Sequence, residues 1–164
     1  MRYAAYGSNL HPVRLCERVS SATSIGIAMA PGWTLAFHKR GKDGSAKCNI
    51  AAGPGSVFFA VFDIDDRGKA LLDKAEGLGF GYQEAHVEIP GFGQCFSYIA
   101  SESHIQEELN PYSWCKELVI VGLEYHQAPS DYLENIRAIP CNLDIDMDRH
   151  DRNMKIVETA RKDT

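Results

Sequence analysis

The stretch Val57-Phe58-Phe59-Ala60-Val61-Phe62 consists entirely of apolar residues. Turn-forming residues precede it at Gly53-Pro54-Gly55, and Asp65 or Asp66 can cap a helix after it. A short apolar run bounded in this way is typical of a strand buried on both faces of a sheet. We therefore expect Val57–Phe62 to be the centre of the core.

Further strand patterns lie on both sides of this segment. Residues 2–6 form a short apolar run, and the other strand-like stretches are at about 24–30, 33–39, 47–52, 82–89 and 94–100. Turns are expected at Pro31-Gly32, at Gly41–Gly44 and at Pro90-Gly91. Hairpins are the simplest connections between these strands.

Helical patterns dominate the last third of the chain. Helices are expected after Ser8-Asn9, from Asp65 or Asp66 to Gly77, from Pro111, and from Pro129 to about Ile139. The chain is predicted to be an α+β protein, in which flanking helices surround a small mixed sheet that is highly curved or barrel-like. We assign residues 1–147 to one domain and residues 148–164 to a polar C-terminal tail or docked helix.

Composition narrows the class of protein. The 164 residues carry 17 basic and 22 acidic side chains, and these are scattered, so neither nucleic acid nor a membrane surface has an evident binding patch. Five cysteines without a Cys-x-x-Cys pair argue against a disulfide framework. With no signal region or apolar span, a cytoplasmic protein that binds a small molecule is expected.

The segment Tyr6-Gly7-Ser8-Asn9-Leu10 is the first candidate for a binding site. A glycine between a strand and a helix allows backbone N–H groups to face one point, where they can hold a carboxylate or phosphate. The alternative is that Gly7 only turns the chain and that Ser8 or Asn9 only caps a helix.

Glu76 is the second candidate. It lies at the predicted C-terminal end of a helix, beside an apolar surface and directly before Gly77. Both surroundings disfavour the charged carboxylate, which would suit a group that accepts and returns a proton near neutral pH. The alternative is a solvated glutamate at a fraying helix end.

Other candidates lack essential parts. The acidic run Asp144–Asp148 has Arg149 in place of the glycine of a calcium loop, so we interpret it as a solvated loop. The histidines show no metal-ligand spacing, and the glycine-rich segment Gly77–Gly81 follows a helix, the wrong order for binding a nucleotide phosphate. Cys48 and Cys115 stand beside lysines but form no nucleophile motif. We expect neither metal nor cofactor.

The two candidate segments together resemble the γ-glutamylcyclotransferase superfamily. Tyr6-Gly7-Ser8-Asn9-Leu10 is similar to its N-terminal signature, and Asp73-Lys74-Ala75-Glu76-Gly77 is similar to its catalytic-glutamate segment. The resemblance continues through Val57–Phe62, Gly81-Tyr82, Ser97-Tyr98 and Gly122–Ile139. One departure is Trp114-Cys115, where the family often has a tyrosine; Tyr112 is nearby.

The resemblance implies a small mixed barrel and a reaction in which a γ-glutamyl amide cyclises to 5-oxoproline. It implies Glu76 as the acid/base residue and a substrate site that contains Tyr6, Gly7, Ser8, Asn9, Leu10, Tyr82 and Tyr98. A silent protein that binds γ-glutamyl or carboxylate metabolites is the alternative, as is an enzyme that removes a γ-glutamyl group from a biosynthetic intermediate. The glutathione-specific branch of the superfamily typically has Gly-Ser-Leu, whereas residues 7–9 of this chain are Gly-Ser-Asn. The resemblance therefore makes glutathione a less favoured substrate. The oligomeric state stays open, a homodimer included.

Overall fold

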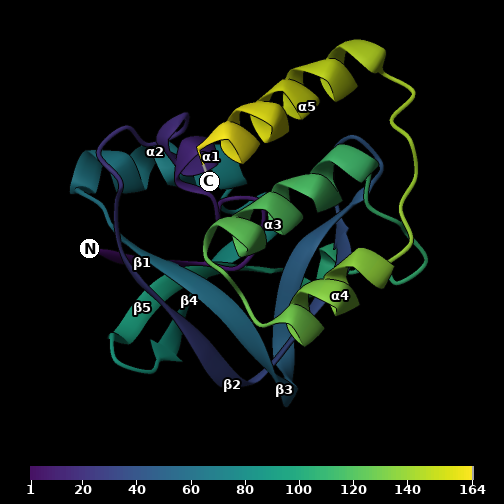
Figure 1. The fold of residues 1–164 in the computed structure, drawn as a ribbon. Helices are drawn as coiled ribbons and strands as arrows, with labels where there is room; N and C mark the ends of the chain where they lie inside the picture. The colour runs from purple at the N-terminus through teal and green to yellow at the C-terminus, as the bar shows by residue number, and fades with distance from the viewer. Residues whose placement is uncertain (164) are drawn as a thin grey trace.

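The computed structural model describes residues 1–163, and Figure 1 shows the fold. Thr164, the last residue of the predicted C-terminal segment, lies outside the described residues. Within residues 1–163, five strands form one mixed sheet: β1 (Arg2–Ala5), β2 (Thr23–Arg40), β3 (Ala46–Asp63), β4 (Tyr82–Ile89) and β5 (Gly93–Ala100). Their order across the sheet is β2-β3-β1-β5-β4. The predicted α+β class and mixed sheet are confirmed.

The long hairpin β2–β3 corrects the predicted strand boundaries. The stretches 24–30 and 33–39 belong to one strand, and so do 47–52 and 57–62. Pro31-Gly32 marks a register shift inside the hairpin, because Pro31 pairs with Ser56 whereas Trp33 pairs with Ala52. The proline and glycine residues of the two strands therefore lie opposite each other. They bend the hairpin at this point and do not reverse the chain.

The short strand β1 joins the two halves of the sheet. It runs antiparallel to β3, with Tyr3 opposite Phe62, and parallel to β5, with Tyr3 opposite Phe96. The β4–β5 hairpin extends the sheet on the far side. The segment that follows β1 is thereby held at the middle of the sheet.

Helices lie over the sheet (Figure 1). They are α1 (Pro12–Cys16), α2 (Asp66–Glu76), α3 (Ser113–Tyr125), α4 (Ser130–Ala138) and α5 (Met147–Lys162), with a 3₁₀ turn at Glu102–His104. Figure 1 shows α3 between α4 and α5. The segment from residue 148 belongs to α5, whose buried residues Val157 and Ala160 give it an inner face.

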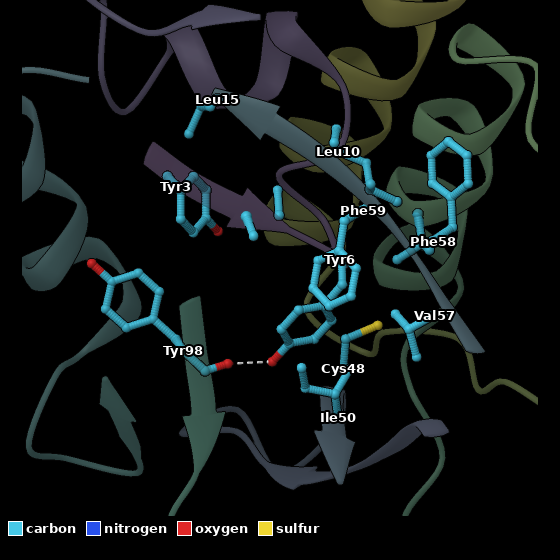
Figure 2. Close-up of a cluster of buried hydrophobic side chains, with 14 of the residues drawn as sticks. Tyr3, Tyr6, Leu10, Leu15, Cys48, Ile50, Val57, Phe58, Phe59 and Tyr98 are labelled. Carbon is cyan, nitrogen blue, oxygen red and sulfur yellow. Dashed lines mark hydrogen bonds between the residues drawn. The ribbon is translucent and has the colours of Figure 1, made fainter. Parts of the chain in front are cut away.

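The core lies between the sheet and these helices. Phe59, Phe62 and Leu10 are among its fully buried side chains, and α3 adds Leu118 and Leu123. Figure 2 shows that residues of the segment after β1 lie beside residues of β3 in this core. In the described part of the chain, no helix is both long and apolar enough to cross a membrane.

Candidate active site

One cavity of about 270 Å³ collects most of the predicted site residues. It lies between the loop after β1, the end of α2, and residues of β2, β3, β4, β5 and α3. The predicted residues that line it are Glu76, Tyr6, Gly7, Ser8, Asn9, Tyr82 and Tyr98. Segments far apart in sequence meet there: the Tyr6 hydroxyl donates to the carbonyl of Tyr98, 92 residues away.

Leu10 does not line the cavity, which corrects its predicted place among the substrate-binding residues. Its side chain is fully buried, and its backbone N–H donates to the carbonyl of Gly7 at 3.0 Å. Gly122 of α3 lies against it, because a Cβ at residue 122 would be 2.4 Å from the Leu10 Cβ. Leu10 therefore anchors the loop in the core, and its N–H is already used.

The loop after β1 also differs from the predicted helix cap. The cap of α1 is His11, whose Nδ1 accepts from the N–H of Val13 at 3.1 Å, and the helix has only five residues. No hydrogen bond within residues 1–163 uses the backbone N–H of Ser8 or Asn9. These two donors are thus available to a ligand, and the short helix adds little to them.

Gly7 is required for a close approach rather than for a turn. Its φ is not in the left-handed region, but a Cβ at this position would lie 3.0 Å from the Cβ of Cys48 on β3. A side chain at residue 7 would therefore separate the loop from the sheet.

Glu76 is held at the cavity by its own helix end and by the loop. The αL conformation of Gly77, with φ of 69°, ends α2 directly after Glu76. The Glu76 side chain is 15% exposed. Its Oε1 accepts from Asn9 Nδ2 at 2.9 Å and from Arg18 Nη1 at 2.5 Å.

Arg18 is a site residue that sequence analysis missed. It follows α1 in a turn, 58 residues before Glu76, and no local pattern links the two. Its guanidinium compensates the charge of the carboxylate. The Glu76 carboxylate therefore has a counter-ion beside it, which the sequence alone did not indicate.

Asn9 connects Glu76 to the core. It is 3% exposed, and its Nδ2 donates to the hydroxyl of Tyr3 at 3.1 Å as well as to Glu76. Its Oδ1 is buried and accepts no hydrogen bond within residues 1–163. A buried amide oxygen without a donor is costly, so a ligand N–H beside it would be favoured.

The predicted tyrosines form walls of the cavity, with hydroxyls that already donate to the protein. Tyr6 donates to the carbonyl of Tyr98, Tyr82 to the carbonyl of Cys48, and Tyr98 to Asp73 Oδ1, each at 2.5 Å. Figure 2 shows the first of these contacts. Burial, above all, raises the pKa of Tyr6, Tyr82 and Tyr98 well above the ordinary value. The three side chains stay neutral and shape the site.

Trp114 and Cys115 line the cavity at the departure from the family pattern, and Tyr112 does not. The indole N–H of Trp114 donates to Asp144 Oδ2 at 2.9 Å, which fixes the ring. Burial raises the pKa of the Cys115 and Cys48 thiols, so both are protonated and weakly nucleophilic at neutral pH.

The chemistry available in the cavity is that of one carboxylate, several N–H donors and several cations. Within residues 1–163, no three His, Cys, Asp or Glu residues are grouped so that they could hold a metal ion. Glu76 is the acidic residue of the described lining. It can exchange a proton with a bound amine, while neighbouring N–H groups can hold an anionic oxygen.

Comparison with known proteins reveals similarity in structure but not in sequence. No family model matches the chain, and no curated protein matches it. A solved γ-glutamyl cyclotransferase matches with a TM-score of 0.82 at 23% identity, over 97% of this chain and 98% of the other.

Two further solved structures support the same fold. The uncharacterized protein loc79017 from Homo sapiens has a TM-score of 0.80 at 23% identity, over 96% of this chain and 97% of its own. YkqA from Bacillus subtilis has a TM-score of 0.73 at 18% identity, over 87% of this chain and 56% of its own. The chain therefore has the γ-glutamylcyclotransferase-like fold, as its two motifs predicted.

Proposed function

We propose that this protein is a γ-glutamylcyclotransferase, which converts a γ-glutamyl amide into 5-oxoproline and a free amine. The observation that carries the proposal is the position of Glu76 beside the Tyr6–Asn9 loop, in a cavity of a fold shared with a γ-glutamyl cyclotransferase. Fold alone does not determine function, so the proposal rests on this site.

The reaction is an intramolecular aminolysis. The α-ammonium of the γ-glutamyl group first gives a proton to Glu76, and the free amine attacks the γ-carbonyl carbon. A C–N bond of the five-membered ring forms, and the C–N bond to the leaving nitrogen breaks. The two protons lost by the α-nitrogen end on the leaving amine, one of them through Glu76.

The protein needs no nucleophilic side chain for this reaction. It must fold the substrate so that the amine and the carbonyl meet, because such positioning supplies much of the rate enhancement in an intramolecular reaction. The free N–H groups of Ser8 and Asn9 are the proposed donors to the α-carboxylate or to the oxyanion that develops at the γ-carbonyl. Arg18 and Asn9 hold Glu76 in place for the proton transfer.

The test compares wild-type protein with Glu76→Gln. Gln keeps the size and can still accept from Asn9 and Arg18, but it cannot take the proton. We expect 5-oxoproline release from γ-glutamyl amides by the wild type and a loss of at least about 100-fold in the variant. Equal release by a folded variant would refute the role of Glu76.

The same assay, combined with a binding measurement, separates the proposed function from its two alternatives. A protein that binds γ-glutamyl compounds by calorimetry, but releases no 5-oxoproline from γ-glutamyl amino acids, γ-glutamyl-lysine or glutathione, would be a binding protein or an enzyme for a specialised intermediate.

A further inference from the structure

The cavity is strongly cationic, although the chain has a net charge of −5. Among the described residues that line it, one is acidic, Glu76, and six are basic: Arg14, Arg18, Lys39, Lys42, Lys47 and Lys74. A cavity lined by one sign of charge concentrates ligands of the opposite sign. The ligand should therefore be anionic.

Half of these cations already have carboxylate partners. Arg18 pairs with Glu76, Lys47 with Asp43 at 2.7 Å, and Arg14 with Glu17 at 3.0 Å. The other three, Lys39, Lys42 and Lys74, make no ion pair within 4 Å in residues 1–163. Their charges are free to meet a ligand.

Lys39 is the most informative of the unpaired cations. It lies near the end of β2 and is only 7% exposed, with Nζ 4.5 Å from the centroid of the Tyr82 ring. Burial lowers its pKa, and the more distant charges of Glu76 and Asp43 oppose this effect only in part. A lysine is rarely buried without a carboxylate, because removing its charge from water is costly. A bound anion would offset this cost.

A second hollow, of about 580 Å³, lies beside the cavity. Both are lined by Lys39, Gly41, Lys42 and Phe80, so they adjoin. The described lining of the second hollow adds Arg40 and His104 and includes no carboxylate. Arg40, like Lys39 and Lys42, makes no ion pair with residues 1–163.

The two spaces suit the two parts of a γ-glutamyl amide. The γ-glutamyl part must lie at Glu76, and its α-carboxylate is attached to the carbon that bears the reacting amine, so it stays near Asn9 and Arg18. The leaving group must then extend elsewhere. The second hollow offers three formal cations, the buried Lys39 and the exposed Arg40 and Lys42, and one carboxylate would balance only one of these charges.

We propose that the leaving group carries at least two carboxylates, as in an acidic amino acid or acidic peptide, and that Lys39 is the main residue that recognises the second one. This inference rests on the proposed cyclotransferase function. Arg40 and Lys42 are exposed and contribute less, because water and salt screen their charges.

The experiment uses two substrates that differ by one charge. γ-Glutamyl-glutamate and γ-glutamyl-glutamine have nearly the same shape, but only the first has a second carboxylate on its leaving group. Their kcat/KM values are measured with wild-type protein, with Lys39→Met, and with Lys155→Met as the control. Met keeps the unbranched stem over Tyr82 and removes the charge, and Lys155 is an exposed residue of α5.

We expect the wild type and Lys155→Met to prefer γ-glutamyl-glutamate by about tenfold or more, which is typical of one hydrogen bond to a charged group. In Lys39→Met this ratio should fall towards one. Equal kcat/KM for both substrates in the wild type would overturn the inference and leave the proposed function intact. An unchanged ratio in folded Lys39→Met would overturn the role of Lys39.

Failure of the proposed function has a different signature, namely no 5-oxoproline from either substrate. Calorimetric measurement of the binding of the same two compounds then tests whether the proposed site for the second carboxylate exists. Tighter binding of γ-glutamyl-glutamate that is lost in Lys39→Met supports the site, and equal binding of both compounds overturns it.

Discussion

The contact between Arg18 and Glu76 can be tested by a double-mutant cycle. Arg18→Met removes the guanidinium but keeps an apolar stem, and Glu76→Gln removes the carboxylate charge. In the wild type the two side chains are 21% and 15% exposed, so each charge depends strongly on the other. Arg18→Met alone leaves the carboxylate with Asn9 as its remaining side-chain donor within residues 1–163.

The expected cost follows from the kind of contact. A hydrogen bond to a charged group contributes about 1.5 to 3 kcal/mol. We therefore expect Arg18→Met to lower the free energy of unfolding by about 2 kcal/mol, which for a chain of this size lowers Tm by about 4 to 8 °C. In the Glu76→Gln background no carboxylate charge remains, so the same substitution should cost about 1 kcal/mol less.

The assay is urea unfolding of the four proteins at neutral pH, with m-values compared to exclude a change in cooperativity. A positive coupling energy of about 1 kcal/mol is the predicted result. If Arg18→Met costs the same in both backgrounds, the ion pair contributes nothing measurable and the description of how Glu76 is held is wrong.

Three further predictions concern the surroundings of the site. Gly122→Ala would place a Cβ 2.4 Å from that of Leu10. Overpacking of up to about 3 kcal/mol exceeds the roughly 1 kcal/mol gained in helix propensity, so urea unfolding should show a loss of about 2 kcal/mol in stability. An unchanged unfolding midpoint would contradict this packing. Hydrogen bonds from Arg149, above all, hold the pKa of Asp144 below its ordinary value. The stabilisation from Asp144 is therefore complete above the unfolded-state pKa of about 3.9 and is lost as pH falls below it. The free energy of unfolding should thus vary less between pH 5 and about pH 3 in Asp144→Asn than in the wild type. Identical pH profiles of the two proteins would count against this role. Tyr82→Phe removes the hydroxyl that donates to the carbonyl of Cys48, so thermal unfolding should show a loss of about 1 kcal/mol in stability. A variant as stable as the wild type would show that this hydroxyl is dispensable.

The parts of the site that could be predicted depend on local signals. The end of α2 is set by Gly77, and its start by Asp65, whose side chain accepts from the N–H of Gly68. Both signals act within a few residues, so the position of Glu76 at a helix end could be derived before the structure was known. The apolar run Val57–Phe62 likewise predicted a buried strand.

The strand boundaries were harder to predict, because turn signals have two meanings. Proline and glycine at Pro31-Gly32 and Gly53–Gly55 are typical of chain reversals, yet they also mark bulges in long strands. Only the pairing of Pro31 with Ser56 shows that the two irregular stretches face each other. This is information about register, which no single stretch of sequence contains.

The electrostatic partners could not be predicted at all. Arg18 meets Glu76 because the segment after α1 packs beside the end of α2, and this proximity is a product of the whole fold. Asp144 was interpreted as part of a solvated loop, but it is buried and accepts from Trp114 and Arg149. In both cases the partners are charged or polar residues, and their positions in the sequence follow no periodic pattern.

The most direct test of the central claim is the identity of the products formed from a γ-glutamyl amide. Nuclear magnetic resonance can follow substrate, 5-oxoproline, glutamate and the free amine in one sample of wild-type protein. Intramolecular aminolysis predicts 5-oxoproline and amine in equal amounts, with no glutamate and with no reaction in Glu76→Gln. Release of glutamate would mean that water attacks the γ-carbonyl, and the account of Glu76 and its cavity as a cyclotransferase site would be contradicted.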